Sequence, residues 1–399
     1  MNVKKVFLHL GISKTGSSSI QKTLFTNSTV LERNGFRYLN EWGVDHDHKL
    51  AQKIKPCSKA NPIFNIARKR YTEYFIKKML KVINTTKSET IIFSGEYWLD
   101  FYLDSAIDNL NNFIERYFKS RGIETKIIVF VRNPLTWMIS HLQQRIGTGN
   151  YRRNQDLVEI RIKSFPGIWN LKNNFGDSLI LVKFEDAVDD EYGLVGFFLR
   201  IIGFPKGQIS EINMVKTNES RCMETMEFIN YIEDKEPAYS SGKTRFVNIN
   251  RKTYGLDLTA TWGIRGLKFD LAYHDKIALK ERLKETVFFL KEHTGIDYTD
   301  YQIPSVPHQE IYSNVTIQDF IDAFPKLSPL LQKLFLSFFE NKYSETLNPK
   351  FKSLYFKDSI PRYIYNKHNP VSWCIWYIRN ISHMIKATIK TIAKNILVR

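Results

Sequence analysis

The sequence predicts an α/β protein in which helices flank both faces of a mostly parallel sheet, with additional helices toward the C-terminus. Short apolar runs typical of buried strands occur at residues 6–10, 90–94, 126–131 and 178–183. Segments with helical periodicity separate each run from the next. Strands that alternate with helices in this way usually form a parallel sheet that is covered on both sides.

The expected helices follow from the spacing of apolar residues between and after these runs. Pro134 suits the first turn of one helix, because proline lacks the N–H group that a first turn leaves unbonded. A polar, basic stretch between Glu236 and Leu258 predicts a loop or linker. The helices are expected at 17–33, 65–84, 103–120, 134–146, 154–174 (interrupted near Pro166), 189–202, 219–233, 276–294 and 328–342.

The chain of 399 residues is long enough for one large α/β core with helical additions. We predict a main domain over residues 1–300, a helical extension over 301–358 and a basic tail over 359–399. The N-terminal apolar run is too short for a signal peptide, so we expect a cytoplasmic protein. The three cysteines lie far apart and lack zinc-site spacing, so we expect neither a disulfide framework nor a metal.

The net charge of +17 predicts attraction to phosphate, sulfate, nucleic acid or an anionic membrane. Charge alone does not choose among these partners. Aromatic residues make up 14% of the chain, but they are scattered through apolar segments, which favours a role in the core. We therefore expect no nucleic-acid partner.

The segment from Ser359 to Arg399 contains seven Lys or Arg residues and no Asp or Glu. This pattern predicts a basic amphipathic helix that is too interrupted by charge to span a bilayer. Two interpretations stay open: the helix packs on its own domain, or it lies on an anionic inner-membrane surface. Its apolar positions are Ile378, Ile381, Ile385, Ile389, Ile392 and Ile396, and its basic positions are Lys386, Lys390 and Lys394.

A glycine- and hydroxyl-rich turn, His9 to Gln21, follows the first apolar run and leads into a helix. Such a turn directs backbone N–H groups and the positive end of the helix dipole toward a phosphate. Gly11 and Gly16 permit the close approach of a ligand. In nucleotide triphosphatases the lysine follows the second glycine, whereas here Lys14 precedes it and Ser17 occupies that position. The turn therefore predicts a P-loop-type fold but not an ordinary ATP or GTP site.

A second motif begins where the run at 126–131 ends in Arg132, Asn133 and Pro134. Arg132 is expected at the carboxyl end of a strand and Ser140 in the following helix. Both can therefore border the crevice in which open α/β sheets bind ligands. The planar guanidinium group of an arginine is well suited to bind a phosphate.

The two motifs together resemble those of the sulfotransferases that use 3′-phosphoadenosine 5′-phosphosulfate (PAPS), especially bacterial carbohydrate-type members. The likeness rests on the run from Lys14 through Gln21 and on a serine eight residues after Arg132, and it covers roughly residues 3–300. It implies PAPS as co-substrate and no metal. Lys14 would contact the 5′-phosphate and the bridging oxygen, and Arg132 and Ser140 would bind the 3′-phosphate. The residues that would cradle the 5′-phosphate are Gly11, Thr15, Gly16, Ser17 and Ser18.

Two looser likenesses to the same family follow along the chain, at Phe184-Glu185-Asp186 and at Asn218-Glu219-Ser220. We predict that Glu185 and Asp186 are turn and capping residues.

Transfer of a sulfuryl group to a hydroxyl requires a base for the hydroxyl proton. Glu96, which follows an expected strand, is the first choice, because many carbohydrate sulfotransferases carry a similar Ser-x-Glu element. His46 and His48 compete with it, since imidazole titrates near neutral pH, and we retain His48 as the second candidate base. The alternatives are a glutamate that bridges at a strand end and histidines in a solvated loop. His9 is interpreted as a structural residue, and His141 is left unassigned.

The resemblance and the basic tail together favour a carbohydrate acceptor that is sulfated on a hydroxyl or amino group, such as a capsule, an O-antigen or a lipid-linked precursor. Segments 151–153, 243–251 and 262–268 combine basic and aromatic residues that suit an anionic glycan, with solvated surface as the alternative. Two other classes stay open: a P-loop phosphotransferase, disfavoured by Ser17, and a non-enzymatic basic glycan-binding protein.

Overall fold

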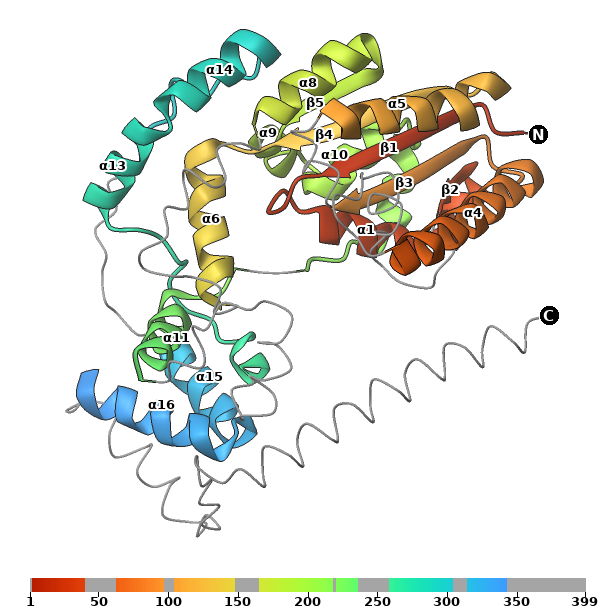
Figure 1. Cartoon of the computed structure of the whole chain (residues 1–399). Coiled ribbons are helices and arrows are strands. Elements are labelled where there is room, and N and C mark those ends of the chain that lie inside the picture. Colours follow the sequence, from red (N-terminus) through yellow and green to blue (C-terminus); the bar gives the residue numbers. More distant parts are fainter. Residues whose placement is uncertain are drawn as a thin grey trace. The chain divides into compact units, whose positions relative to one another are not determined.

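The computed structural model of the chain (Figure 1) divides into two units, Met1–Phe338 and Phe339–Arg399. The sheet and the helices that cover it belong to the first unit. The domain limits expected at residues 300 and 358 stay predictions, and the tail at 359–399 lies outside the described residues. The structure describes residues 2–39, 62–96, 104–147, 165–217, 220–235, 258–303 and 314–342.

A five-stranded parallel sheet forms the centre of the first unit, with the strand order β2-β3-β1-β4-β5. This arrangement confirms the predicted α/β class. Four strands lie where the apolar runs predict them, and the short β2 was not predicted. The strands are β1 (Lys5–Gly11), β2 (Phe36–Tyr38), β3 (Thr90–Glu96), β4 (Glu124–Val131) and β5 (Leu179–Lys183).

Helices cover both faces of the sheet because alternate strand residues point to opposite sides. In β1, Val6 and Leu8 belong to one apolar core, whereas Phe7 belongs to the other. The first core is closed by α4 (Pro62–Thr85), α5 (Asp104–Tyr117), α8 (Pro166–Phe175) and α14 (Lys284–Thr294). The second is closed by α1 (Ser17–Thr26), α2 (Ser28–Arg33), α9 (Phe184–Val188) and α10 (Gly193–Ile201).

A smaller helical cluster packs around Phe335. The centroid of the Phe335 ring lies 5.1 Å from that of the Phe228 ring and 5.4 Å from that of the Phe320 ring. The cluster joins α11 (Met223–Lys235), α15 (Asn314–Ala323) and α16 (Pro329–Lys342), and α11 also contacts α6 (Pro134–Gly147). None of the helices that the structure describes combines the length and the apolar character needed to cross a membrane.

Two of the expected helices are interrupted. The helix expected at 17–33 breaks at Asn27, whose side-chain amide donates to the carbonyl of Thr23 at 2.7 Å. The helix expected at 276–294 is divided at Leu283 into α13 (Tyr273–Arg282) and α14. Short 3-10 turns lie at η1 (Lys119–Arg121), η2 (Gly176–Ser178), η3 (Lys206–Glu211), η4 (Thr259–Thr261) and η5 (Phe324–Lys326).

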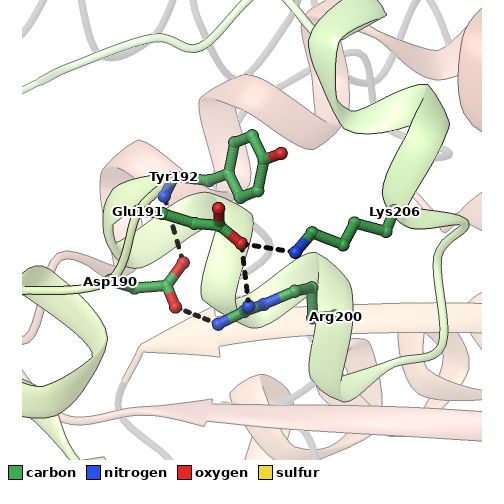
Figure 2. Close-up of polar contacts among 5 residues, drawn as sticks. All are labelled: Asp190, Glu191, Tyr192, Arg200 and Lys206. Carbon is green, nitrogen blue, oxygen red and sulfur yellow. Dashed lines mark hydrogen bonds and ion pairs between the residues drawn. The ribbon is translucent and has the colours of Figure 1, made fainter.

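A network of charged residues fixes the turn before α10 (Figure 2), where the sequence predicts one helix from residue 189. Asp190 accepts a hydrogen bond from the backbone N–H of Tyr192 at 3.1 Å and also pairs with Arg200. Glu191 lies 3.4 Å from Arg200 and 2.8 Å from Lys206. The helix begins only at Gly193, because the two carboxylates hold the preceding residues in a turn.

Candidate phosphate-binding site

The loop between β1 and α1 contains two residues, separated by Thr15, in the left-handed region of backbone space. Gly16 has a φ of 73°, and Lys14 has a φ of 68°. A side chain makes this region unfavourable by about 1–2 kcal/mol for residues other than glycine. Strain of this kind persists where the surrounding structure imposes it, which is a common property of functional loops.

Gly11 and Gly16 allow the loop to pack closely on its neighbours. A Cβ atom on Gly11 would lie 2.4 Å from Oγ of Ser17 and 3.1 Å from the carbonyl oxygen of Gly95. A Cβ atom on Gly16 would lie 2.1 Å from Cδ2 of Leu194, in the first turn of α10. Leu194, which comes two residues after Tyr192 in the turn of Figure 2, therefore packs directly against Gly16 of the loop.

The hydroxyl-bearing side chains of the loop differ in how far they are buried. Oγ1 of the buried Thr15 donates to the carbonyl of Ile12 at 2.7 Å, and Oγ of the buried Ser17 lies 3.4 Å from the same carbonyl. Ser18 is half-buried. Thr15 and Ser17 thus brace the loop with their side chains. The backbone N–H of Thr15 also donates to the carbonyl of Ile12, at 3.3 Å, whereas Ser17, as the first residue of α1, can offer its backbone N–H to a phosphate.

Arg132 connects the two sequence motifs directly. Its Nη1 donates to the carbonyl oxygen of Lys14 at 2.9 Å, across 118 residues of sequence. Nε donates to Oγ1 of Thr136 at 3.1 Å, and the guanidinium lies 5.1 Å above the ring of Phe184. Burial lowers the pKa of Arg132, and the nearby carboxylate of Glu185 opposes that effect. The site therefore holds a guanidinium group beside the loop between β1 and α1.

The first turn of α6 provides further support for the loop. Asn133 caps the helix, since its Oδ1 accepts hydrogen bonds from the backbone N–H groups of Leu135 at 2.9 Å and Thr136 at 3.3 Å. One turn into the helix, Nε1 of Trp137 donates to the carbonyl of Ser13 at 2.8 Å. The predicted position of Pro134 at the helix start is confirmed. Sequence reasoning missed Trp137.

Glu185 holds the turn that carries Arg132. Its Oε1 accepts a hydrogen bond from the backbone N–H of Asn133 at 3.1 Å, and its Oε2 accepts one from the Tyr298 hydroxyl at 2.8 Å. The same hydroxyl lies 2.7 Å from the carbonyl of Val131. Glu185 itself lies in the first turn of α9, and its side chain binds the turn before α6. Tyr298, far along the chain, gave no sequence signal.

The extended segment at residues 213–217 runs alongside α1 toward the loop between β1 and α1. Asn213, Val215 and Thr217 donate their backbone N–H groups to the side chains of Asn27, Thr23 and Ser19, at 2.9, 3.0 and 3.1 Å. The spacing of four residues between the acceptors places them on one face of α1. The segment therefore reaches the first turn of α1 at Thr217, just before the looser motif at 218–220. Within that motif, the structure describes Ser220 and not Asn218 or Glu219.

The remaining predicted residues are described to different extents. Ser140 is half-buried on α6, one turn beyond Thr136, and within the described parts of the chain no hydrogen bond links it to Arg132 or to the loop. Glu96 is the last residue of β3 and pairs with Gly11 of β1. The structure describes the backbone of Glu96 and not its side chain. His46 and His48 lie outside the described residues.

His9 is buried directly before the loop. Its Nδ1 lies 2.7 Å from Oγ of Ser94, and its ring contacts those of Phe130 and Phe198. Burial lowers the pKa of His9 to about 3, so the imidazole is neutral at physiological pH. Its packing is that of a structural residue.

Comparisons with known proteins give little further information. No protein-family model matches the sequence, and no curated protein matches it. Among solved structures, the chain is similar to retinol dehydratase in a complex with retinol and PAP (adenosine 3′,5′-bisphosphate). The TM-score is 0.28 and the sequence identity is 15%. The match covers 76% of this chain and 84% of that chain. A likeness at this level carries no argument. The chain's own geometry defines its class: a parallel α/β protein whose P-loop-like turn is bonded to an arginine at the end of β4.

Proposed function

We propose that this protein is a sulfotransferase that uses PAPS as its sulfuryl donor. The observation that carries the proposal is the 2.9 Å hydrogen bond from Arg132 to the carbonyl of Lys14. It joins the loop between β1 and α1 and a half-buried guanidinium into one site at the carboxyl ends of β1 and β4. A donor with separate 5′- and 3′-phosphate groups suits such a site. The position of Ser17 disfavours the alternative of a P-loop phosphotransferase.

In the proposed mechanism, PAPS supplies the sulfuryl group, and the residues of this chain bind and stabilise charge. Lys14 neutralises negative charge on the departing 5′-phosphate, assisted by backbone N–H groups of the loop and the dipole of α1. Arg132 binds the 3′-phosphate, and Ser140 adds a hydroxyl donor from α6, the helix that follows Arg132. The left-handed backbone of Lys14 is consistent with a loop held ready for its ligand.

For the acceptor proton we propose Glu96 as the base. Its support is the register of the sheet, which sets Glu96 beside Gly11, the first glycine of the loop. His48 stays the second candidate.

Replacement of Glu96 and His48 by glutamine, one at a time, separates the two candidate bases. The Glu96→Gln variant is expected to lose more than 100-fold in kcat while it retains donor affinity, because general-base catalysis contributes roughly 10²–10⁴-fold. His48→Gln would then stay near wild-type activity. The opposite pattern assigns the base to His48.

We propose that the acceptor is a carbohydrate. It would be a surface glycan such as a capsule or an O-antigen, or the lipid-linked precursor of such a glycan. The net charge of +17 supports an acidic partner, and the basic tail supports a substrate at an anionic membrane surface. Tail deletion after Tyr363 tests the second part by sedimentation with vesicles that contain anionic lipid. Full-length protein is expected to sediment with the vesicles, and the deleted form to stay in solution. Equal behaviour of the two forms would exclude membrane binding by the tail.

Donor turnover tests the proposed activity. With PAPS and a panel of glycans, wild-type protein is expected to release adenosine 3′,5′-bisphosphate (PAP) without magnesium. Lys14→Ala should reduce this release at least 100-fold, since removal of one electrostatic group from an active site has typically that effect. Lys22→Ala, on α1 outside the loop, serves as the matched control and should retain activity. Turnover of ATP with magnesium in place of PAPS would favour the phosphotransferase.

A further inference from the structure

An exposed tryptophan and a half-buried arginine form a cation–π pair outside the candidate phosphate-binding site. The side chain of Trp262, which directly follows η4, is 61% exposed. The guanidinium carbon of Arg221 lies 5.4 Å from the centroid of its ring, within the range of a cation–π contact. The indole therefore presents most of its surface to solvent although Arg221 covers part of it. Tryptophan is enriched at binding interfaces because it combines a large apolar ring with a polar N–H group.

Arg221 is held in place by the end of α6. Its Nη1 donates to the carbonyl of Gly147 at 2.9 Å, and its own carbonyl accepts a hydrogen bond from Nε2 of Gln143 at 2.7 Å. A Cβ atom on Gly147 would lie 2.3 Å from Nη1 of Arg221, so a larger residue there would displace the guanidinium. The orientation of Arg221 is thus fixed before any ligand arrives.

The segment that carries Trp262 is fixed as well. The backbone N–H of Met223 donates to the carbonyl of Leu267 at 2.7 Å, and the buried carboxylate of Glu224 accepts from the N–H of Leu267 at 3.1 Å. An isolated antiparallel β-bridge pairs the backbone of Cys222 with that of Lys268. The exposed Lys268 side chain therefore belongs to the same segment. The pair therefore belongs to a rigid, basic surface, which suits recognition because little ordering is lost on binding.

The chain itself limits the distance between this pair and the phosphate loop. Thr217 is bonded to Ser19 in the first turn of α1, and Arg221 follows four residues later. Four residues span at most about 14 Å. A ligand of several sugar units that reacts at the phosphate loop can therefore also reach Arg221 and Trp262.

We propose that Trp262 and Arg221 form a subsite for an acidic sugar of the acceptor glycan. The exposed indole offers an apolar surface to the face of a sugar ring, while Arg221 and the exposed Lys268 attract its carboxylate. The inference rests on the proposed function and adds the residues that bind an acidic sugar of the acceptor. The charge of this surface favours a uronic-acid polymer over a neutral glycan.

Titration calorimetry with two oligosaccharides of matched length and linkage tests the subsite. The acidic probe is an α-1,4-linked oligogalacturonide, and the neutral probe is a maltooligosaccharide. Wild-type protein is expected to bind the acidic probe at least tenfold more tightly than the neutral one. Trp262→Ala should weaken acidic-probe binding by about tenfold or more, the usual effect of losing a central tryptophan, and Trp262→Phe should restore part of it. Trp169→Ala, which removes a 37% exposed tryptophan from α8, is the matched control and should change nothing.

Titration of PAP into the same variants separates the subsite from the donor site. Trp262→Ala is expected to bind PAP as tightly as wild type. Loss of PAP binding in this variant would overturn the subsite, because it would assign the indole to the donor. Failure of wild type to bind the acidic probe, or equal binding by Trp262→Ala, would overturn it too. Absence of PAP binding in wild type, in contrast, counts against the proposed sulfotransferase function itself.

Discussion

Lys14 combines the charge that the proposed reaction needs with a backbone conformation that its side chain disfavours. Replacement by glycine removes that conflict, whereas replacement by alanine keeps it. We expect Lys14→Gly to be more stable than Lys14→Ala by about 1 kcal/mol, as measured by equilibrium urea unfolding. Both variants should lose PAP affinity. Equal stability of the two would argue against a left-handed Lys14.

His9 gives the protein a pH dependence below neutrality. Its pKa falls to about 3 in the folded state, from an ordinary value of 6.5, so the unfolded chain binds the proton more readily. The contribution of His9 to the free energy of unfolding is therefore fully present above about pH 6.5 and is lost as the pH falls toward 3. Between pH 7 and pH 5, His9 alone should reduce the free energy of unfolding by about 2 kcal/mol.

Urea unfolding of His9→Gln at both pH values isolates this contribution. Glutamine can still bond to Ser94 but does not titrate, so the variant should lose about 2 kcal/mol less than wild type over this interval. His274→Gln, at an exposed histidine on α13, is the control and should follow wild type. An unchanged pH dependence in His9→Gln would mean that His9 does not titrate as a buried group.

At the scale of elements, Tyr298 links β4 to α9 through Val131 and Glu185. Tyr298→Phe removes the hydroxyl whose one proton these two acceptors share, so the buried carbonyl of Val131 and the half-buried carboxylate of Glu185 lose their donor. We expect a loss of about 1–3 kcal/mol in stability. PAP affinity should also fall, since Glu185 positions the Arg132 turn. Thermal unfolding and PAP titration measure both effects.

Tyr301→Phe is the matched control for Tyr298→Phe. Tyr301 is a half-buried neighbour, and its hydrogen bond to Lys280 uses its backbone carbonyl, which the substitution leaves intact. This variant should stay close to wild type in both measurements. A loss of stability as large as that of Tyr298→Phe would show that the region responds to any substitution, so the specific role of the Tyr298 hydroxyl would be unsupported.

The main strands could be predicted because parallel strands buried on both faces are continuous apolar runs. The short β2 was missed because three residues give too little pattern. At the helix break, Asn27 bonds to Thr23 and also to Asn213, and the second residue lies 186 residues away and leaves no local signal. The turn before α10 rests instead on near contacts of Asp190 with Tyr192 and Arg200, which the periodicity of apolar residues does not reveal.

At the scale of the whole molecule, the sheet order explains how two distant motifs meet. The chain leaves β1 toward β3 and β2 and returns to β4 on the other side, so the loops after β1 and β4 lie together at the switch point. The sequence could therefore predict Lys14 and Arg132 as partners in one site. It could not predict Trp137, Tyr298 or Leu194, because their contacts arise only from tertiary packing.

The account depends most directly on whether Arg132 belongs to a site for PAP. Calorimetric titration of PAP without magnesium into wild type, Arg132→Ala and Arg132→Gln measures this. Arg33→Ala, at an exposed arginine on α2, is the control and should match wild type. Tight binding by wild type should weaken roughly ten- to a hundredfold in both Arg132 variants, the effect of about 1.5–3 kcal/mol from a charged hydrogen bond. No binding of PAP, with binding of ATP and magnesium instead, would contradict the account.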